Sequence, residues 1–181
     1  MIKYNMIKAL VCTILFFIGF TINAQTIVVG GSNWSIPITP ITEAGMDYTG
    51  TYESVDFTIS GNLPGSFLNL LSGKVTTVSV QYVPNIWNNN LHLYAKRTGG
   101  TATINGLCVL CSALINNGTT YVEILPNTNT SFFTINFSGV LGLGNSVSYS
   151  GINTQLKISG VSVTVPADSY SATIVFTIAA L

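Results

Sequence analysis

Residues 156–181 read LKISGVSVTVPADSYSATIVFTIAAL, and they contain two runs in which apolar and polar residues alternate. The first run becomes regular once a one-residue slip is allowed at Ser159 and Gly160, which is what a β-bulge containing glycine produces. The second run follows turn residues 166–169. The apolar sets are Leu156, Ile158, Val161, Val163 and Val165, then Tyr170, Ala172, Ile174, Phe176 and Ile178. The stretch therefore predicts two paired strands that share one buried face.

Similar alternating runs recur through the rest of the chain between clusters of Gly, Pro, Asn and Ser. We expect strands at 54–60, 74–83, 91–97, 101–105, 120–125 and 131–138. Strand 91–97 is the expected hairpin partner of 74–83, with Leu91, Leu93 and Ala95 on one face. Residues 98–100 should form a turn and 139–144 a bend, because both are rich in glycine. Segment 66–72 is either a short helix or a short strand.

These patterns predict the fold class. They give about nine or ten short strands and no helix long enough to join parallel strands. We therefore expect an all-β protein, an immunoglobulin-like antiparallel β-sandwich spanning residues 43–181.

The first 24 residues have the pattern of a secretory signal peptide. Lys3 and Lys8 precede an apolar run at 9–20, and small residues lead to Ala24. The run is too short for a membrane span, which needs about 20 apolar residues. We expect cleavage before Gln25, no membrane span in the mature chain, and a secreted or cell-surface protein, reached through the periplasm if the source is Gram-negative.

Charge is scarce, at 7% of the residues. Without the signal peptide, the cations Lys74, Lys96, Arg97 and Lys157 stand against six acidic residues, which leaves a slight negative charge. Nucleic acid is a disfavoured partner, because its binding needs clustered cations. A strand-rich chain with so few charges is prone to associate, so we expect self-association or contact with other surface subunits.

Cys108 and Cys111 form the sharpest local motif, C-V-L-C. A redox enzyme would place such a motif at the start of a helix after a strand, and a zinc site would need two further ligands. In an exported chain the pair predicts a structural disulfide. His92, the single histidine, falls in an expected strand with its ring opposite Leu91 and Leu93, and we predict a solvent-facing residue. We name no catalytic residue, metal site or cofactor.

Carboxylates and aromatic residues give weaker signals. Asp47, Glu53 and Asp56 could be glycosidase carboxylates or calcium ligands, but no spacing specifies either, and a solvated loop with polar strand positions is the simpler interpretation. Aromatic rings can stack on sugars, and the sandwich core uses them too. The candidate stacking residues are Trp87, Tyr48 and Tyr52, with Trp34 and Tyr94 as further aromatic residues.

The expected hairpin at the end of the chain also resembles part of a known protein family. The run Pro-Ala-Asp-Ser-Tyr-Ser at 166–171, followed by the alternating residues 174–178, resembles the final turn and strand of chaperone-usher pilin subunits, in particular the spore coat protein U-like branch. The resemblance implies an incomplete sandwich whose missing strand is supplied by the N-terminal extension of a neighbouring subunit. It also implies a periplasmic chaperone as a partner.

Residues 25–42 allow two interpretations. Their alternating residues Ile27 and Val29, with Gly31, make a candidate donor strand, and the same residues could equally be the first strand of the domain itself. The sequence thus predicts a non-enzymatic, exported, fimbrial or adhesive subunit that assembles by β-strand addition. The alternative is a secreted carbohydrate-binding β-sandwich module.

Overall fold

A computed structural model describes residues 24–38, 52–64, 74–139 and 141–179, except for the side chains of 52–56 and 141–144. The described ranges contain nine β-strands and no helix. The predicted signal peptide, apart from Ala24, lies outside them, as does segment 66–72. The strands are β1 (Thr26–Gly30), β2 (Tyr52–Pro64), β3 (Lys74–Ile86), β4 (His92–Val109), β5 (Ser112–Asn116), β6 (Val122–Ile124), β7 (Thr130–Ser138), β8 (Leu141–Ser159) and β9 (Ser171–Ile178).

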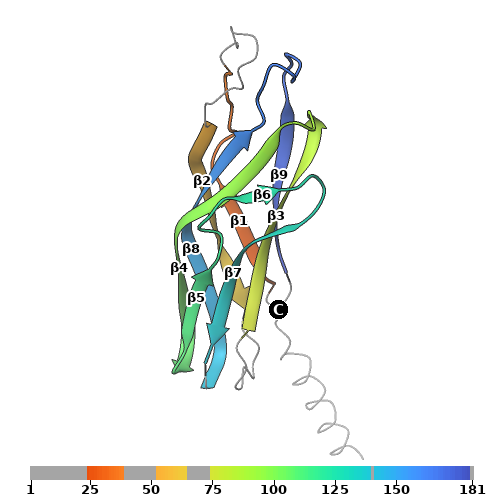
Figure 1. Ribbon diagram of the computed structural model, residues 1–181. Helices are drawn as coiled ribbons and strands as arrows, with labels where there is room; N and C mark the ends of the chain where they lie inside the picture. Colours follow the sequence, from red (N-terminus) through yellow and green to blue (C-terminus); the bar gives the residue numbers. More distant parts are fainter. Residues whose placement is uncertain (1–23, 39–51, 65–73, 140, 180–181) are drawn as a thin grey trace, which may run out of the picture.

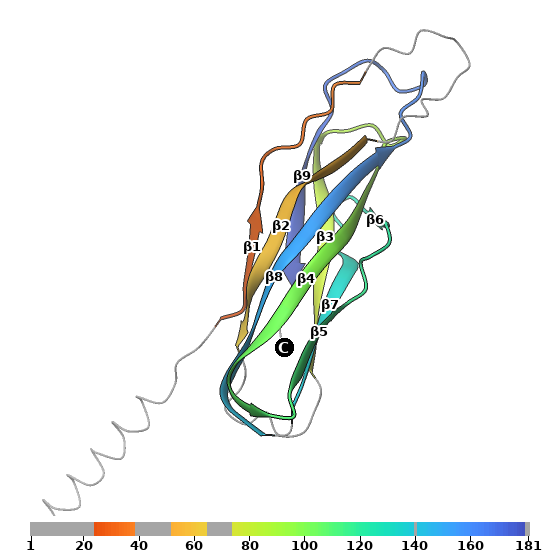
Figure 2. The same ribbon diagram turned by 90° about the vertical axis from the view of Figure 1, so that its left-hand side faces the viewer.

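The strands form two sheets that pack face to face. The first sheet has the order β1-β2-β8-β4-β6, and the second has the order β5-β7-β3-β9. Every strand pair is antiparallel. Figure 2 looks onto the first sheet, with its strands in that order from left to right. The predicted all-β antiparallel sandwich is confirmed.

The core follows from the two-residue period of the strands. Thr76, Val78, Val80 and Tyr82 of β3 are buried and alternate with more exposed residues. Facing them across the sandwich are Ile59 and Leu63 of β2, Leu93 and Ala95 of β4, and Val147, Tyr149, Ile152 and Leu156 of β8. Successive side chains of a strand point to opposite faces, so each strand contributes every second residue to the core.

The predicted hairpin at the end of the chain is wrong. β8 ends at Ser159 in the first sheet, whereas β9 pairs with β3 in the second. Gly160 has a φ of 82°, and a Cβ on it would overlap the carbonyl oxygen of Asn90. The chain therefore turns away at Gly160, and residues 160–170 cross between the sheets at one end of the sandwich (Figure 1). The apolar face predicted for 170–178 does pack against the core.

The predicted hairpin of 74–83 with 91–97 is also wrong, because β3 and β4 belong to different sheets. Their link is a tight turn in which the Leu91 N–H donates to the carbonyl of Asn88 at 3.0 Å. The chain then enters the first sheet, where β4 pairs with β8 and β6. Leu91, Leu93 and Ala95 share the buried face, as predicted. A short loop can join strands of one sheet or of two, and the sequence pattern does not distinguish these cases.

Two further expectations fail because β4 and β8 are long. β4 has 18 residues and β8 has 19, and they pair along most of their lengths. The predicted turn at 98–100 lies inside β4, and most of the predicted bend at 139–144 lies inside β8. Gly99 and Gly100 have φ values of 68° and 104°, and Gly151 opposite them has 66°. Glycine adopts positive φ values without steric cost. Such values depart from extended strand geometry, so both strands bend at this point.

Arg97 continues the buried face of β4 and is only 7% exposed. Its guanidinium donates to three backbone carbonyls, those of Asn117, Gly99 and Ile115. Its own N–H donates to the carbonyl of Gly118. Burial lowers the pKa of Arg97. The side chain thus ties the segment that follows β5 to the middle of β4.

Candidate functional site

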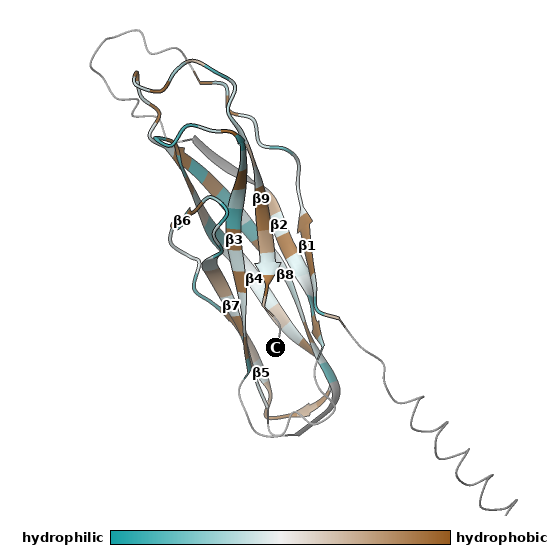
Figure 3. Ribbon diagram, turned by 90° about the vertical axis from the view of Figure 1, so that its right-hand side faces the viewer, coloured by the Kyte–Doolittle hydropathy of each residue, from teal (hydrophilic) through white to brown (hydrophobic). Residues whose placement is uncertain are grey.

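The two long sides of the sandwich differ in how they are closed. On one side β4 leads through Leu110 and Cys111 into β5, so the chain itself connects the sheets there. On the same side the chain after β6 bonds to β3, with Tyr82 N–H donating to Leu125 O at 3.2 Å and Asn127 N–H donating to Tyr82 O at 2.8 Å. On the opposite side lie the sheet ends β1 and β9 (Figure 3).

β9 is an edge strand with a half-covered inner face. Within the described ranges it pairs with β3 and with no second strand. Its inward residues Ala172, Ile174, Phe176 and Ile178 pack against the core but are only partly buried. The inward aromatic and aliphatic residues of β7, at the interior of the same sheet, are buried. The core is therefore only partly covered on the side of the sandwich where β1 and β9 lie together.

β1 lies beside β9 on the same side of the sandwich. It pairs with β2 of the same chain, from Thr26 opposite Asn62 to Gly30 opposite Thr58. Ile27 packs against the core, Val29 is exposed, and Gly31 follows the strand with a φ of 126°. The candidate donor residues thus lie at the sheet edge beside β9. Thr26 holds this strand through two bonds: its Oγ1 accepts from Asn62 N–H at 3.0 Å, and its carbonyl accepts from the Tyr149 hydroxyl at 2.8 Å.

Tyr149 should make the unfolding free energy of the protein depend on pH in the alkaline range. Burial raises the pKa of Tyr149 to about 12, against about 10 for an exposed tyrosine. The unfolded chain loses this proton first, so we expect roughly 2–3 kcal/mol of unfolding free energy to be lost as pH rises from about 10 to about 12. Urea unfolding at several pH values measures how the unfolding free energy changes with pH. In Tyr149→Phe this change should be smaller, and an unchanged pH dependence in that variant would contradict the role given to Tyr149.

The disulfide lies at the end of the sandwich where β4 passes into β5. Cys108 and Cys111 have sulfur atoms within bonding distance and Cα atoms 5.8 Å apart, which agrees with the predicted disulfide. Both cysteines are partly buried against the core. The two residues between them, Val109 and Leu110, are 55% and 82% exposed. The bond therefore closes the end of the core and displays an apolar pair at the surface.

Leu110 has an unusual backbone conformation. Its φ is 53°, and the other two non-glycine residues with positive φ in the described ranges are Asn117 and Asn127. Asparagine tolerates this region, whereas leucine pays about 1–2 kcal/mol there. We expect Leu110→Asn to raise the unfolding free energy by about 0.5–1 kcal/mol, measured in urea under oxidising conditions. A loss of stability instead would mean that the leucine side chain contributes packing that outweighs the strain.

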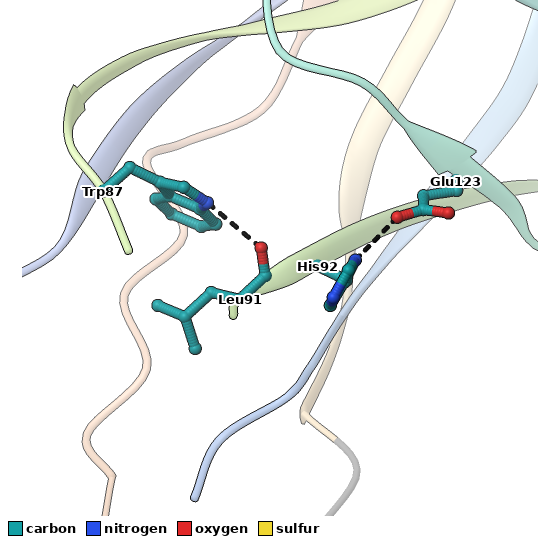
Figure 4. A network of polar contacts seen from close by, with 4 residues as sticks. All are labelled: Trp87, Leu91, His92 and Glu123. Atoms are coloured by element: carbon teal, nitrogen blue, oxygen red, sulfur yellow. Dashed lines mark hydrogen bonds and ion pairs between the residues drawn. The ribbon is translucent and has the colours of Figure 1, made fainter. Parts of the chain in front are cut away.

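Trp87 lies in the link between β3 and β4 and is engaged within the protein. Its indole N–H donates to the carbonyl of Leu91 at 3.1 Å, as Figure 4 shows, and its ring lies 5.3 Å from that of Tyr82. Trp34 is likewise partly buried against the core. Tyr48 and the side chain of Tyr52, the other two candidate stacking residues, lie outside the described part of the chain.

The outer face of the first sheet carries a polar cluster that the sequence analysis did not predict. The ammonium groups of Lys96 and Lys157 lie 4.6 and 4.9 Å from the centre of the Tyr121 ring, and Lys157 lies 5.2 Å from that of Tyr94. Tyr94 and Lys157 are direct cross-strand neighbours, as are Lys96 and Gln155. The signal for this cluster was the alternation itself, which places Tyr94 and Lys96 opposite the buried residues of β4.

His92 faces solvent, as predicted, and its Nδ1 lies 2.7 Å from Glu123 Oε1 (Figure 4). Both side chains are exposed, so the pair contributes little to stability. In the described part of the chain, no group of three or more His, Cys, Asp and Glu residues could hold a metal ion. Asp47 and the side chains of Glu53 and Asp56 lie outside that part. No helix among the described residues is long and apolar enough to cross a membrane.

Comparison with known proteins does not assign the chain to a family. No family model matches the chain, and no curated protein and no solved structure matches it. The inference of function therefore depends on the surfaces described above.

Proposed function

We propose that this chain is an exported, non-enzymatic structural or adhesive subunit with an immunoglobulin-like, pilin-like sandwich, and that it assembles by β-strand addition at β9. One observation carries the proposal. β9 is a sheet edge whose inward side chains are partly buried, next to the second edge, β1. An added strand would bond to the free side of β9 and cover Phe176 and Ile178 with its own alternate side chains.

The composition of both edges supports this proposal. Proteins that remain monomeric protect edge strands with proline, lysine or inward-pointing charge. β9 reads SATIVFTI and β1 reads TIVVG, and neither contains proline or a charged residue. Val28 and Val29 of β1 are exposed large apolar residues. Such edges favour pairing with another strand. Export is inferred from residues 1–24, and the scarcity of charge on the chain agrees with a protein built to associate.

Two neighbouring proline substitutions test the role of the β9 edge. Along an antiparallel edge strand, successive N–H groups point alternately toward the neighbour and away from it. Of Thr173→Pro and Ile174→Pro, one therefore removes a bond to β3, and the other blocks only the open side. The variant that keeps a wild-type circular dichroism spectrum and melting temperature is the informative one. We expect it to be monomeric by light scattering after size exclusion, while the wild-type chain 25–181 forms larger species that resist mild denaturant.

A truncation lacking residues 25–39 completes the test. The deletion removes β1 and the packing of Ile27, so it should lower stability in any case. Under strand addition it should also abolish the larger species, because the chain then lacks the candidate donor. A truncated chain that is fully stable and monomeric, together with a monomeric wild-type chain, would show that strand addition does not occur.

A further inference from the structure

The end of the sandwich closed by the disulfide carries four exposed apolar side chains. Leu107 and Val109 of β4, Leu110 at the apex and Leu114 of β5 are 81%, 55%, 82% and 59% exposed. We call these four residues the apolar tip. Their neighbours Cys108, Ala113 and Ile115 pack against the core. Leu107 and Val109 therefore point outward from the first sheet, and Leu114 points outward from the second.

The region around the apolar tip has almost no charge. Between Arg97 and Lys157 the sequence contains one charged residue, Glu123, and no histidine. Glu123 pairs with Tyr94, in the half of β4 farther from the tip. The nearest cation by register is Lys74, because Lys74 and Ala113 lie on either side of Phe137. Ala113 lies three positions from Leu110 along the chain, so Lys74 sits about 10 Å behind the apex at ~3.4 Å per residue.

The apolar tip is held rigidly in its exposed position. The β4–β8 ladder runs to Val109 opposite Leu141, and the β5–β7 ladder begins at Ser112 opposite Ser138. The disulfide joins the ends of both strands across Leu110. Leu110 also keeps a backbone conformation that asparagine or glycine would adopt at lower cost. Strain of this kind that carries an exposed apolar side chain indicates a use for that side chain.

We propose that the apolar tip inserts into the interfacial layer of a lipid bilayer. At ~3.4 Å per residue, Leu107 lies about 10 Å and Leu114 about 14 Å behind Leu110 along the chain. Peripheral apolar segments enter the headgroup and acyl boundary by about 5–10 Å, a depth that takes in Leu110 and Val109 and reaches Leu107. The backbone groups of β4 and β5 are largely paired within their ladders, so few of them need solvent there. Lys74 would then lie at the level of the lipid phosphates.

The distribution of the side chains favours lipid over a protein partner. Apolar residues point outward from both sheets and from the apex, and a fluid medium can surround all three directions at once. Protein interfaces concentrate their affinity in Trp, Tyr and Arg. Residues 105–116 contain none of these and expose aliphatic side chains instead. The inference is independent of strand addition, which uses the opposite sheet edges.

Binding of the oxidised chain 25–181 to phosphatidylcholine vesicles, with and without phosphatidylglycerol, tests this proposal. We expect co-flotation with the vesicles, and Leu110→Ser should weaken binding roughly ten- to hundredfold, because a buried leucine side chain is removed. The matched control is Val163→Ser, which removes an exposed valine from the loop at the other end of the sandwich. That variant should bind within about twofold of wild type. Reducing the disulfide should weaken binding, since Val109 and Leu110 lose their fixed position.

A tryptophan at the apex gives a second measurement. The chain already contains Trp34 and Trp87, so the wild-type chain gives the reference emission. Relative to it, Leu110→Trp should show an additional blue-shifted emission that brominated lipid quenches when vesicles are added. Absence of vesicle binding by the wild-type chain would overturn the proposal, as would equal binding by Leu110→Ser. A change in self-association by Leu110→Ser without vesicles would also overturn it and assign the tip to a second copy. The β9 proline variants are measured without lipid, so failure of strand addition is read separately.

Discussion

Replacing Arg97 with methionine is expected to lower the free energy of unfolding by about 3–5 kcal/mol, because three carbonyl groups in partly buried hydrogen bonds lose their donor at once. The guanidinium bonds to Gly99 O at 2.9 Å and Ile115 O at 3.0 Å, and also to Asn117 O. Removing a buried charge offsets part of this loss, so the full sum of three bonds is not expected. Urea unfolding of the oxidised protein at neutral pH measures the change.

Two variants show whether the effect comes from the planar guanidinium. Arg97→Lys keeps the charge but cannot direct donors to three separate carbonyls, so it should recover only part of the loss. Lys96→Met lies on the outer face of the same strand and should change stability by about 0.5 kcal/mol or less. If Arg97→Met cost under about 1 kcal/mol, the carbonyls would have to find water, and the tie between β4 and residues 115–118 would be unimportant.

Arg97 also shows what the sequence pattern could and could not predict. The alternation of Leu91, Leu93 and Ala95 was correctly assigned to the buried face, and one more step along the same period reaches Arg97. An arginine is rarely buried without a charged partner, so composition argued against that position. Its guanidinium bonds go to the backbone carbonyls of Gly99 in β4, Ile115 in β5 and Asn117 just after β5, and such partners leave no side-chain signature in the sequence.

Pairing between strands was harder to predict than their inward faces. The inward faces of β4 and β9 followed from alternation, whereas each predicted hairpin joins strands that lie in different sheets. At the end of β8, Gly160 lies so close to the carbonyl of Asn90, far away in sequence, that a side chain there would overlap it. Gly99 and Gly100 gave the prediction of a turn, although they lie inside β4 and face Gly151 across the ladder with β8. Local propensity contains no information on such cross-strand meetings.

The candidate surfaces, too, were predictable only in part. The disulfide was predicted from the expected export of the chain and from the C-V-L-C spacing. The exposure of the leucines around the disulfide could not be predicted, because an apolar run in a β protein normally lies in the core. The edge position of β9 could be recognised only from the order of strands in the sheet, because a strand with one neighbour has the same alternation as a strand with two.

Substituting Gly61 with alanine is expected to release β1 from the sheet. Gly61 lies opposite Ile27 of β1 and Tyr149 of β8. A Cβ on Gly61 would overlap both the carbonyl oxygen of Thr26 and the Tyr149 hydroxyl, the two groups whose hydrogen bond ties β1 to the core. Because one of the overlapping atoms is backbone, no rotamer change relieves the clash. We expect a loss of about 2–4 kcal/mol and rapid amide exchange over residues 26–30.

Gly30→Ala is the matched control, since its Cβ would meet the hydroxyl of Thr58, a side chain that can rotate. It should retain slow exchange in β1. The comparison also bears on assembly, because a released β1 is a free strand and leaves β2 as a second open edge. If β1 is the donor, Gly61→Ala should form larger species at lower protein concentration than Gly30→Ala. If the alanine at 61 frees β1 and the chain stays monomeric, the strand added at β9 comes from another source than β1 of a neighbouring copy.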